Sequence, residues 1–157
     1  MNADAKVMEL YPAPLSRAEA EAFPERIQRG FDDNGFHLYA AEVKTAGEFI
    51  GYVGLSRTVF AAPFTSAIEI GWRLFFAAWG HGYATEAGTA YLVHGFSGLG
   101  LREITSFKAR TNARSIAVME RLCMLRNADE DFEHPALPVG HPLRPHVLYR
   151  IGVPDTS

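Results

Sequence analysis

The sequence has almost no cysteine and no marked excess of charge. Cys123 is the only cysteine among the 157 residues. One cysteine excludes an intrachain disulfide and a cysteine-based zinc cluster. The net charge is −3, from 15 basic and 18 acidic residues, so bulk charge does not recruit a nucleic acid, although a local basic patch stays open. We expect no nucleic-acid partner and no metal site.

Long apolar runs are absent as well. No stretch approaches the roughly 18 apolar residues that span a bilayer, and residues 1–6 (MNADAK) lack the apolar core of a signal peptide. We therefore expect a cytoplasmic protein with no membrane partner. Hydrophobic residues make up 48 % of the chain and aromatic residues 12 %. This hydrophobic content is enough for a packed core without a metal or disulfide. The chain length is that of one ordinary domain, so we expect one domain over residues 1–157.

Local patterns predict alternating helices and strands. Ser16 and Glu19 form a capping box, which predicts a helix over residues 17–28 that Gly30 and the DDNG sequence at 32–35 break. Alternation and turn residues predict the other elements. The expected strands are 36–43, 49–55, 67–74, 102–109 and 146–151, with helices over 84–96 and after 112, and loops over 57–66 and 127–145. This pattern indicates a sheet with flanking helices, in the α/β or α+β class.

A glycine-rich turn is the most informative local feature. Gly80 and Gly82 follow a strand and precede a helix, so backbone N–H groups and a helix N-terminus converge on one point, where a pyrophosphate could bind. The Walker pattern is absent, and Thr85 stands where the dinucleotide fingerprint requires glycine or alanine. The alternative is a tight strand–helix turn without a ligand.

Three ordered motifs carry a resemblance to a known family. They are EIGW at residues 69–72, WGHGYATEA at 79–87, and Asn112 followed by Ser115 and VMERL at 118–122. Together they resemble the GNAT superfamily of acetyl-coenzyme A-dependent N-acetyltransferases, in the branch with the ribosomal-protein-alanine acetyltransferases. The resemblance implies an α+β, three-layer α/β/α fold, with a mixed, mostly antiparallel sheet splayed open around acetyl-CoA. It also implies transfer of the acetyl group to a primary amine, on a protein N-terminus or a small molecule, by direct attack.

The resemblance also implies a coenzyme site. Backbone of β-strand residues 70–73 would pair with the pantetheine arm, the turn amides would hold the pyrophosphate, and Asn112 would meet the pantetheine from the other side. Arg114 is the candidate for the 3′-phosphate, unless it belongs to a solvated basic face. The expected cofactor-binding residues are Ile70, Gly71, Trp72, Arg73, Trp79, Gly80, His81, Gly82, Tyr83, Ala84, Thr85, Asn112 and Arg114.

Two residues are candidates for catalysis. An amine attacks a thioester only when neutral, and a carboxylate near it can take its proton. Glu69 is the candidate base, since it matches a glutamate used as base in parts of the superfamily; the alternative is a salt-bridged carboxylate on the sheet face. Many family members use a tyrosine where this chain has Met119. Ser115 is therefore our candidate partner for the leaving sulfur, unless it is a plain helix-terminus residue.

Several features depart from the family pattern. Cys123 replaces a usual glycine, and because a positive φ there costs about 1 kcal/mol we expect a local backbone adjustment, not a catalytic thiol. His134, His141 and His146 have no metal-ligand spacing, so we expect them to pack in the loop.

The front of the family pattern, a first strand and helix, has no counterpart here. A misassigned start, a natively short chain or a partner that completes the sheet would each explain this. Residues 36–43 would then form an exposed edge strand, so we expect a homodimer and a wide substrate cleft. The rival function is a non-catalytic acyl-CoA sensor or partner subunit of the same fold, and a nucleotide-binding protein is weaker still.

Overall fold

One sheet organises the chain. A computed structural model describes residues 1–153; residues 154–157, which the single-domain prediction includes, lie outside the described part. The sheet runs in the order β1-β2-β3-β4-β7-β5, with β6 also paired to β7. All pairings are antiparallel except that of β3 with β4. The strands are β1 (Leu38–Val43), β2 (Glu48–Arg57), β3 (Ile68–Leu74), β4 (Glu103–Ala109), β5 (Leu125–Arg126), β6 (Phe132–Glu133) and β7 (Pro145–Gly152). This arrangement confirms the predicted mixed, mostly antiparallel sheet.

The sheet opens where β3 meets β4. These parallel strands share one register pair, Glu69 with Thr105. The buried Thr105 hydroxyl donates to the Ile68 carbonyl at 3.0 Å, and the buried Ser106 hydroxyl donates to the Ile70 carbonyl at 2.9 Å. Side chains thus satisfy β3 carbonyls at the point where the strands diverge. This is the opening that the family resemblance implied.

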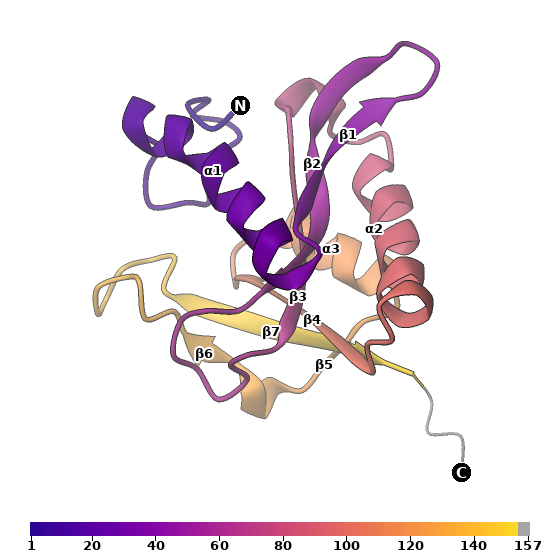
Figure 1. Cartoon of the computed structure of the whole chain (residues 1–157). Helices are drawn as coiled ribbons and strands as arrows, with labels where there is room; N and C mark the ends of the chain where they lie inside the picture. Colours follow the sequence, from indigo (N-terminus) through magenta and orange to yellow (C-terminus); the bar gives the residue numbers. More distant parts are fainter. Residues whose placement is uncertain (154–157) are drawn as a thin grey trace.

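Helix α1 (Arg17–Asn34) covers one face of the sheet (Figure 1). The capping box at its start is confirmed, and it ends at Gly35 with φ 78°. The predicted break at Gly30 is wrong, because this glycine serves a close approach: a Cβ there would lie 2.0 Å from the His37 ring. The helix packs through Phe23, whose ring centroid lies 5.0 Å from that of Tyr52 on β2.

Two helices cover the opposite face. Helix α2 (Tyr83–Val93) continues as a π-helix, η2 (His94–Gly98), and α3 (Ala113–Arg121) packs beside it. Short 3₁₀ turns, η1 (Phe76–Ala78) and η3 (Ala128–Glu130), precede α2 and follow β5. Figure 1 shows α1 and α2 on opposite sides of β2 and β3, so helices flank both faces as expected. The core on the α2 side includes Leu55, Ile70, Ile104 and Met119, which are 0–1 % exposed.

The end of α3 corrects a second prediction. Cys123 keeps a φ of 60°, so the expected backbone adjustment does not occur. The N–H of Cys123 donates to the Glu120 carbonyl at 3.0 Å, and the N–H of Met124 donates to the Met119 carbonyl at 3.1 Å. These bonds, together with burial of the Met124 side chain, hold the left-handed cap in place although its residue is not glycine.

Strand β1 stands at one end of the sheet order, as predicted for residues 36–43. Its backbone pairs with β2 alone among residues 1–153. In the same part of the chain, no helix is long and apolar enough to cross a membrane.

Candidate active site

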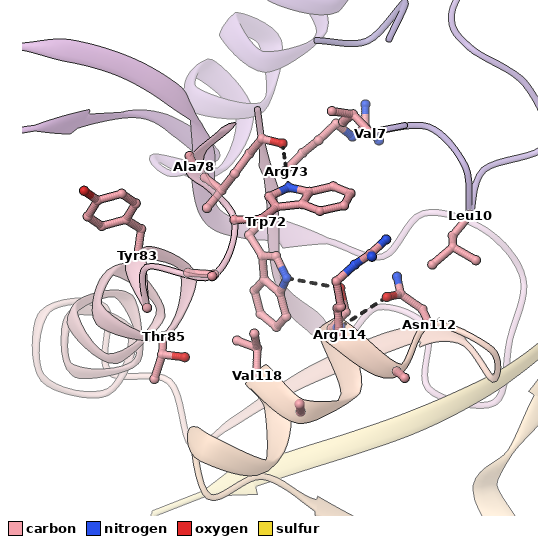
Figure 2. Close-up of a pocket in the computed structure, with 18 of the residues that line it drawn as sticks. Val7, Leu10, Trp72, Arg73, Ala78, Tyr83, Thr85, Asn112, Arg114 and Val118 are labelled. Carbon is pink, nitrogen blue, oxygen red and sulfur yellow. Dashed lines mark hydrogen bonds between the residues drawn. The ribbon is translucent and has the colours of Figure 1, made fainter. Parts of the chain in front are cut away.

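A cavity of 860 Å³ occupies the opening of the sheet. Its walls come from β3, the turn after η1, the N-terminal half of α2, one side of α3, and Lys6, Val7 and residues 9–11 of the N-terminal segment. Figure 2 shows Tyr83 and Thr85 of α2 on one side, and Arg114 of α3 and its N-cap Asn112 on the other, with Trp72 between them. The resemblance placed acetyl-CoA in this opening.

The glycine turn forms the end of this cavity at α2. Gly80 and Gly82 have φ values of 77° and 78°, and a Cβ at either position would meet open space. The backbone conformation, and not crowding, is therefore what requires glycine. No side chain caps α2 at its N-terminus, so the first N–H groups of the helix have no side-chain acceptor. A turn of this kind binds anions such as pyrophosphate.

Trp79 and Arg114 form a stacked wall of the same cavity. The Trp79 indole donates to the Leu74 carbonyl at 3.1 Å, and the Arg114 guanidinium lies 4.1 Å from the centroid of the Trp79 ring. Arg114 also forms an ion pair with Glu9 at 3.6 Å. Its charge is thus beside the cavity but already has one anionic partner. His81 is exposed and stacks on Tyr83, with ring centroids 5.4 Å apart.

Asn112, Ser115 and Trp72 are linked by hydrogen bonds. The Asn112 side-chain oxygen caps α3 by accepting from the Ser115 N–H at 3.1 Å. The Ser115 hydroxyl in turn accepts from the Trp72 indole N–H at 3.3 Å. Because this hydroxyl is used as an acceptor, its own proton remains for another acceptor in the cavity. These two bonds appear as dashed lines in Figure 2.

The edge of β3 that faces the opening has one free segment. The Ile70 carbonyl accepts from Ser106 and the Leu74 carbonyl accepts from Trp79. Alternate residues of a strand direct their backbone groups to the same side, so the backbone of Trp72 lies between these two occupied carbonyls. Residues 70–73 were predicted to pair with pantetheine. Among them, Trp72 has unoccupied backbone groups on this edge, whereas the Ile70 carbonyl already accepts from Ser106.

A second cavity of 380 Å³ adjoins the first, and both are lined by Tyr11, Trp72, Arg73 and Asn112. Glu69 lies in the second cavity, where its carboxylate is 3.7 Å from the Lys108 ammonium. The two side chains are only 17 % and 13 % exposed. Burial raises the pKa of Glu69 above its usual value, while Lys108 acts in the opposite direction. Glu69 thus lines a cavity, as a base must, and it also forms a salt bridge, as the alternative interpretation predicted.

Sequence reasoning missed two parts of this region. No pattern indicated that Lys108 would pair with Glu69, and none indicated that Leu10 and Tyr11 of the N-terminal segment would line both cavities. Two of the three C-terminal histidines pack together: His134 and His146, the latter on β7, lie with ring centroids 4.9 Å apart beside Phe107. Both line the second cavity. Burial lowers the pKa of His146 from 6.5 to about 4. Within residues 1–153, no group of three or more side chains could hold a metal ion.

Comparison with known proteins gives a consistent picture. Residues 1–124 match the acetyltransferase (GNAT) domain family. The uncharacterized protein YkkB of Bacillus subtilis strain 168 is 30 % identical over 121 residues, which covers 77 % of this chain and 69 % of that protein.

Two solved structures illustrate the likeness in fold. The ribosomal-protein-S5-alanine acetyltransferase from Vibrio fischeri has a TM-score of 0.69 at 19 % identity, covering 90 % of this chain and 77 % of that one. The spermidine N-acetyltransferase from Vibrio cholerae, in complex with CoA and spermine, has a TM-score of 0.71 at 17 % identity, covering 96 % and 85 %. At these identities the likeness concerns the fold.

Proposed function

This chain belongs to the GNAT acetyltransferase family, and from that premise we propose that it transfers an acetyl group from acetyl-CoA to a primary amine. The acyltransferase activity is that of the family; the amine acceptor and the residues that act are our proposal. The observation that supports this proposal is the arrangement of three features around the opening of the sheet. The uncapped N-terminus of α2, the free edge of β3 at Trp72 and the buried Glu69 line two adjoining cavities.

The larger cavity would hold the coenzyme. The backbone N–H groups that follow Gly80 and Gly82 would bind the pyrophosphate, because the first turn of α2 has no side-chain cap. The backbone of Trp72 would pair with the pantetheine arm, with Asn112 opposite it. Arg114 would meet the 3′-phosphate, in exchange for or in addition to its pairing with Glu9.

The smaller cavity would hold the acceptor amine. Glu69 takes the amine proton, directly or through a water, so that the nitrogen lone pair can attack the acetyl carbon. A base with a raised pKa is a better proton acceptor near neutral pH than an ordinary carboxylate, and burial supplies that shift for Glu69. As the C–N bond forms and the C–S bond breaks, the Trp72 N–H on the open edge of β3 stabilises the oxyanion. Ser115 donates its hydroxyl proton in a hydrogen bond to the departing sulfur.

The acceptors named for the two Vibrio proteins do not decide the acceptor here. One is named for the alanine of a ribosomal protein, and the other for spermidine and is seen with spermine. Both kinds of acceptor present a primary amine. We extend only that shared chemistry to this chain.

We also propose that two copies of the chain associate through the open edge of β1. An unpaired strand edge is a template for pairing, and Tyr39 on β1 is 39 % exposed while Phe49 on β2 is 45 % exposed. Size-exclusion chromatography with light scattering should give a dimeric mass. A monomeric mass at all concentrations would refute this pairing.

The activity is tested by release of the CoA thiol from acetyl-CoA in the presence of a panel of primary amines. Glu69→Gln is isosteric and should lose most turnover while it still binds acetyl-CoA. The matched control is Glu25→Gln, which changes an exposed carboxylate on α1 that lines neither cavity and should keep its rate on the same amine. Unchanged turnover in Glu69→Gln would exclude Glu69 as the base. Coenzyme binding without turnover on any amine would contradict the proposed function.

A further inference from the structure

The charged side chains of the smaller cavity are arranged along one face of β3. Glu69 and Arg73 are four residues apart on this strand, so their Cα atoms lie about 13 Å apart on the same face. Gly71 stands between them, and a Cβ built there meets only a Glu69 carboxylate oxygen at 3.8 Å. The cavity therefore has a floor without a side chain, with a carboxylate at one end and a guanidinium at the other.

The charges in this cavity do not balance. Glu69 and Lys108 form an ion pair and neutralise each other. His134 and His146 both have their pKa values lowered by burial, which favours the neutral rings at pH 7. Arg73 remains, and it carries a full positive charge at any accessible pH.

Arg73 lacks the anion that a half-buried guanidinium ordinarily has. Within residues 1–153, no acidic side chain lies within ion-pair distance of it; its hydrogen-bond partners are the Asn2 side-chain oxygen at 3.0 Å and the Tyr52 hydroxyl at 3.1 Å. The guanidinium also lies 4.2 Å from the centroid of the Tyr11 ring. Its Nε is buried and has no hydrogen-bond partner.

These neutral contacts orient the guanidinium without neutralising it. Burying an unpaired charge is unfavourable, and a guanidinium presents a planar set of donors that matches a carboxylate. A carboxylate that enters the cavity would therefore gain a charge-assisted hydrogen bond. A second positive charge on the ligand would instead be repelled.

We infer that the acceptor amine carries a carboxylate, which pairs with Arg73 while the amino group lies at Glu69. This inference rests on the proposed acetyl transfer and narrows its acceptor to the amino-carboxylate class, that is, amino acids or short peptides. It assigns to Arg73 the part of a specificity determinant. Polyamines, which carry only positive charge, would be poor acceptors.

Matched acceptors test the inference in the wild-type protein. Alanine, alanylalanine and γ-aminobutyrate are each compared with the corresponding amide, and spermidine is the polycation; thiol release gives kcat/KM. For at least one pair, we expect the acid to exceed its amide by tenfold or more, mainly through KM. The pair that responds also distinguishes an amino acid from a peptide. Equal rates for every acid and amide, or spermidine as the best acceptor, would overturn the inference while leaving acetyl transfer intact.

Variants then assign the preference to one side chain. Arg73→Met should reduce the preference for the acid to less than twofold, and Arg73→Lys should keep part of it because the charge remains. Arg29→Met is the control, since Arg29 is exposed on α1 and paired only loosely, at 3.9 Å, within its own helix. An acid preference that persists in a folded Arg73→Met protein would overturn the assignment.

A second readout separates this inference from the proposed function. If no amine is acetylated, acetyl transfer fails, but binding of each acid and amide to the CoA-loaded protein can still be measured by calorimetry. The inference then predicts that the acid binds at least tenfold more tightly than its amide. Equal binding would overturn it.

Discussion

Replacing Cys123 with glycine should stabilise the protein. Cys123 has a φ of 60° directly after α3, and the left-handed conformation costs an L-residue about 1–2 kcal/mol. Glycine removes this strain but adds about 0.5–1 kcal/mol of backbone entropy to the unfolded chain. The net gain in the free energy of unfolding is therefore about 0–1.5 kcal/mol, and a gain of about 1 kcal/mol is equivalent to about 2–4 °C in Tm for a domain of this size.

The thiol contributes little that this substitution would remove. Cys123 is exposed, and its sulfur lies 4.0 Å from the Arg121 carbonyl, at the limit of a weak hydrogen bond. Cys123→Ala is therefore the matched control, because alanine removes the thiol and keeps the strained φ. It should change the free energy of unfolding by less than about 0.5 kcal/mol.

Urea denaturation under reducing conditions, followed by circular dichroism, measures both variants. Cys123→Gly should be more stable than Cys123→Ala, and Cys123→Ala should be close to the wild type. A glycine variant that is no more stable than the alanine variant would refute the claim that backbone strain is stored at this cap.

Three further predictions concern the cavities. The pKa of His146 is lowered from 6.5 to about 4, chiefly by burial. The stability that this neutral ring contributes is therefore complete above pH 6.5 and is lost as the pH falls toward 4. With allowance for partial solvent screening, the loss is about 2 kcal/mol. Urea titrations at several pH values should show a smaller loss in His146→Phe and an unchanged loss in His81→Phe, whose ring is exposed. Lys108→Met removes the cation that opposes the raised pKa of Glu69, so the acidic limb of kcat/KM should move to higher pH; an unmoved limb would exclude this pairing from the chemistry. Gly82→Ala imposes about 1–2 kcal/mol of left-handed strain on the turn. Calorimetry should show acetyl-CoA binding weakened about tenfold, and unchanged affinity would contradict the role of the turn.

The sequence predicted the elements that local chemistry determines. The capping box of Ser16 and Glu19 starts α1 where expected, and the alternation over residues 67–74 corresponds to β3, in which Ile68 and Ile70 are buried. The edge position of β1 followed from the family pattern. Gly30 was misread because a glycine can break a helix or permit a close approach, and only the position of His37 decides between these.

The smaller cavity could not be predicted from local sequence patterns for a similar reason. Glu69 and Lys108 are 39 residues apart and meet because β3 and β4 are adjacent. Arg73 was expected to contribute only its backbone. Its side chain is held by Asn2 and Tyr11 of the N-terminal segment, and no periodicity in that segment predicts such contacts. The glycine turn at Gly80 and Gly82, in contrast, is contiguous in sequence, so its glycines could be found directly.

A calorimetric titration of the purified chain with acetyl-CoA is the most direct test of the account, because every proposed role depends on a coenzyme in the larger cavity. We predict saturable binding of one acetyl-CoA per chain with micromolar affinity, and much weaker binding of ADP or NAD. A folded sample that binds no acetyl-CoA, or that binds ADP or NAD more tightly, would contradict the account.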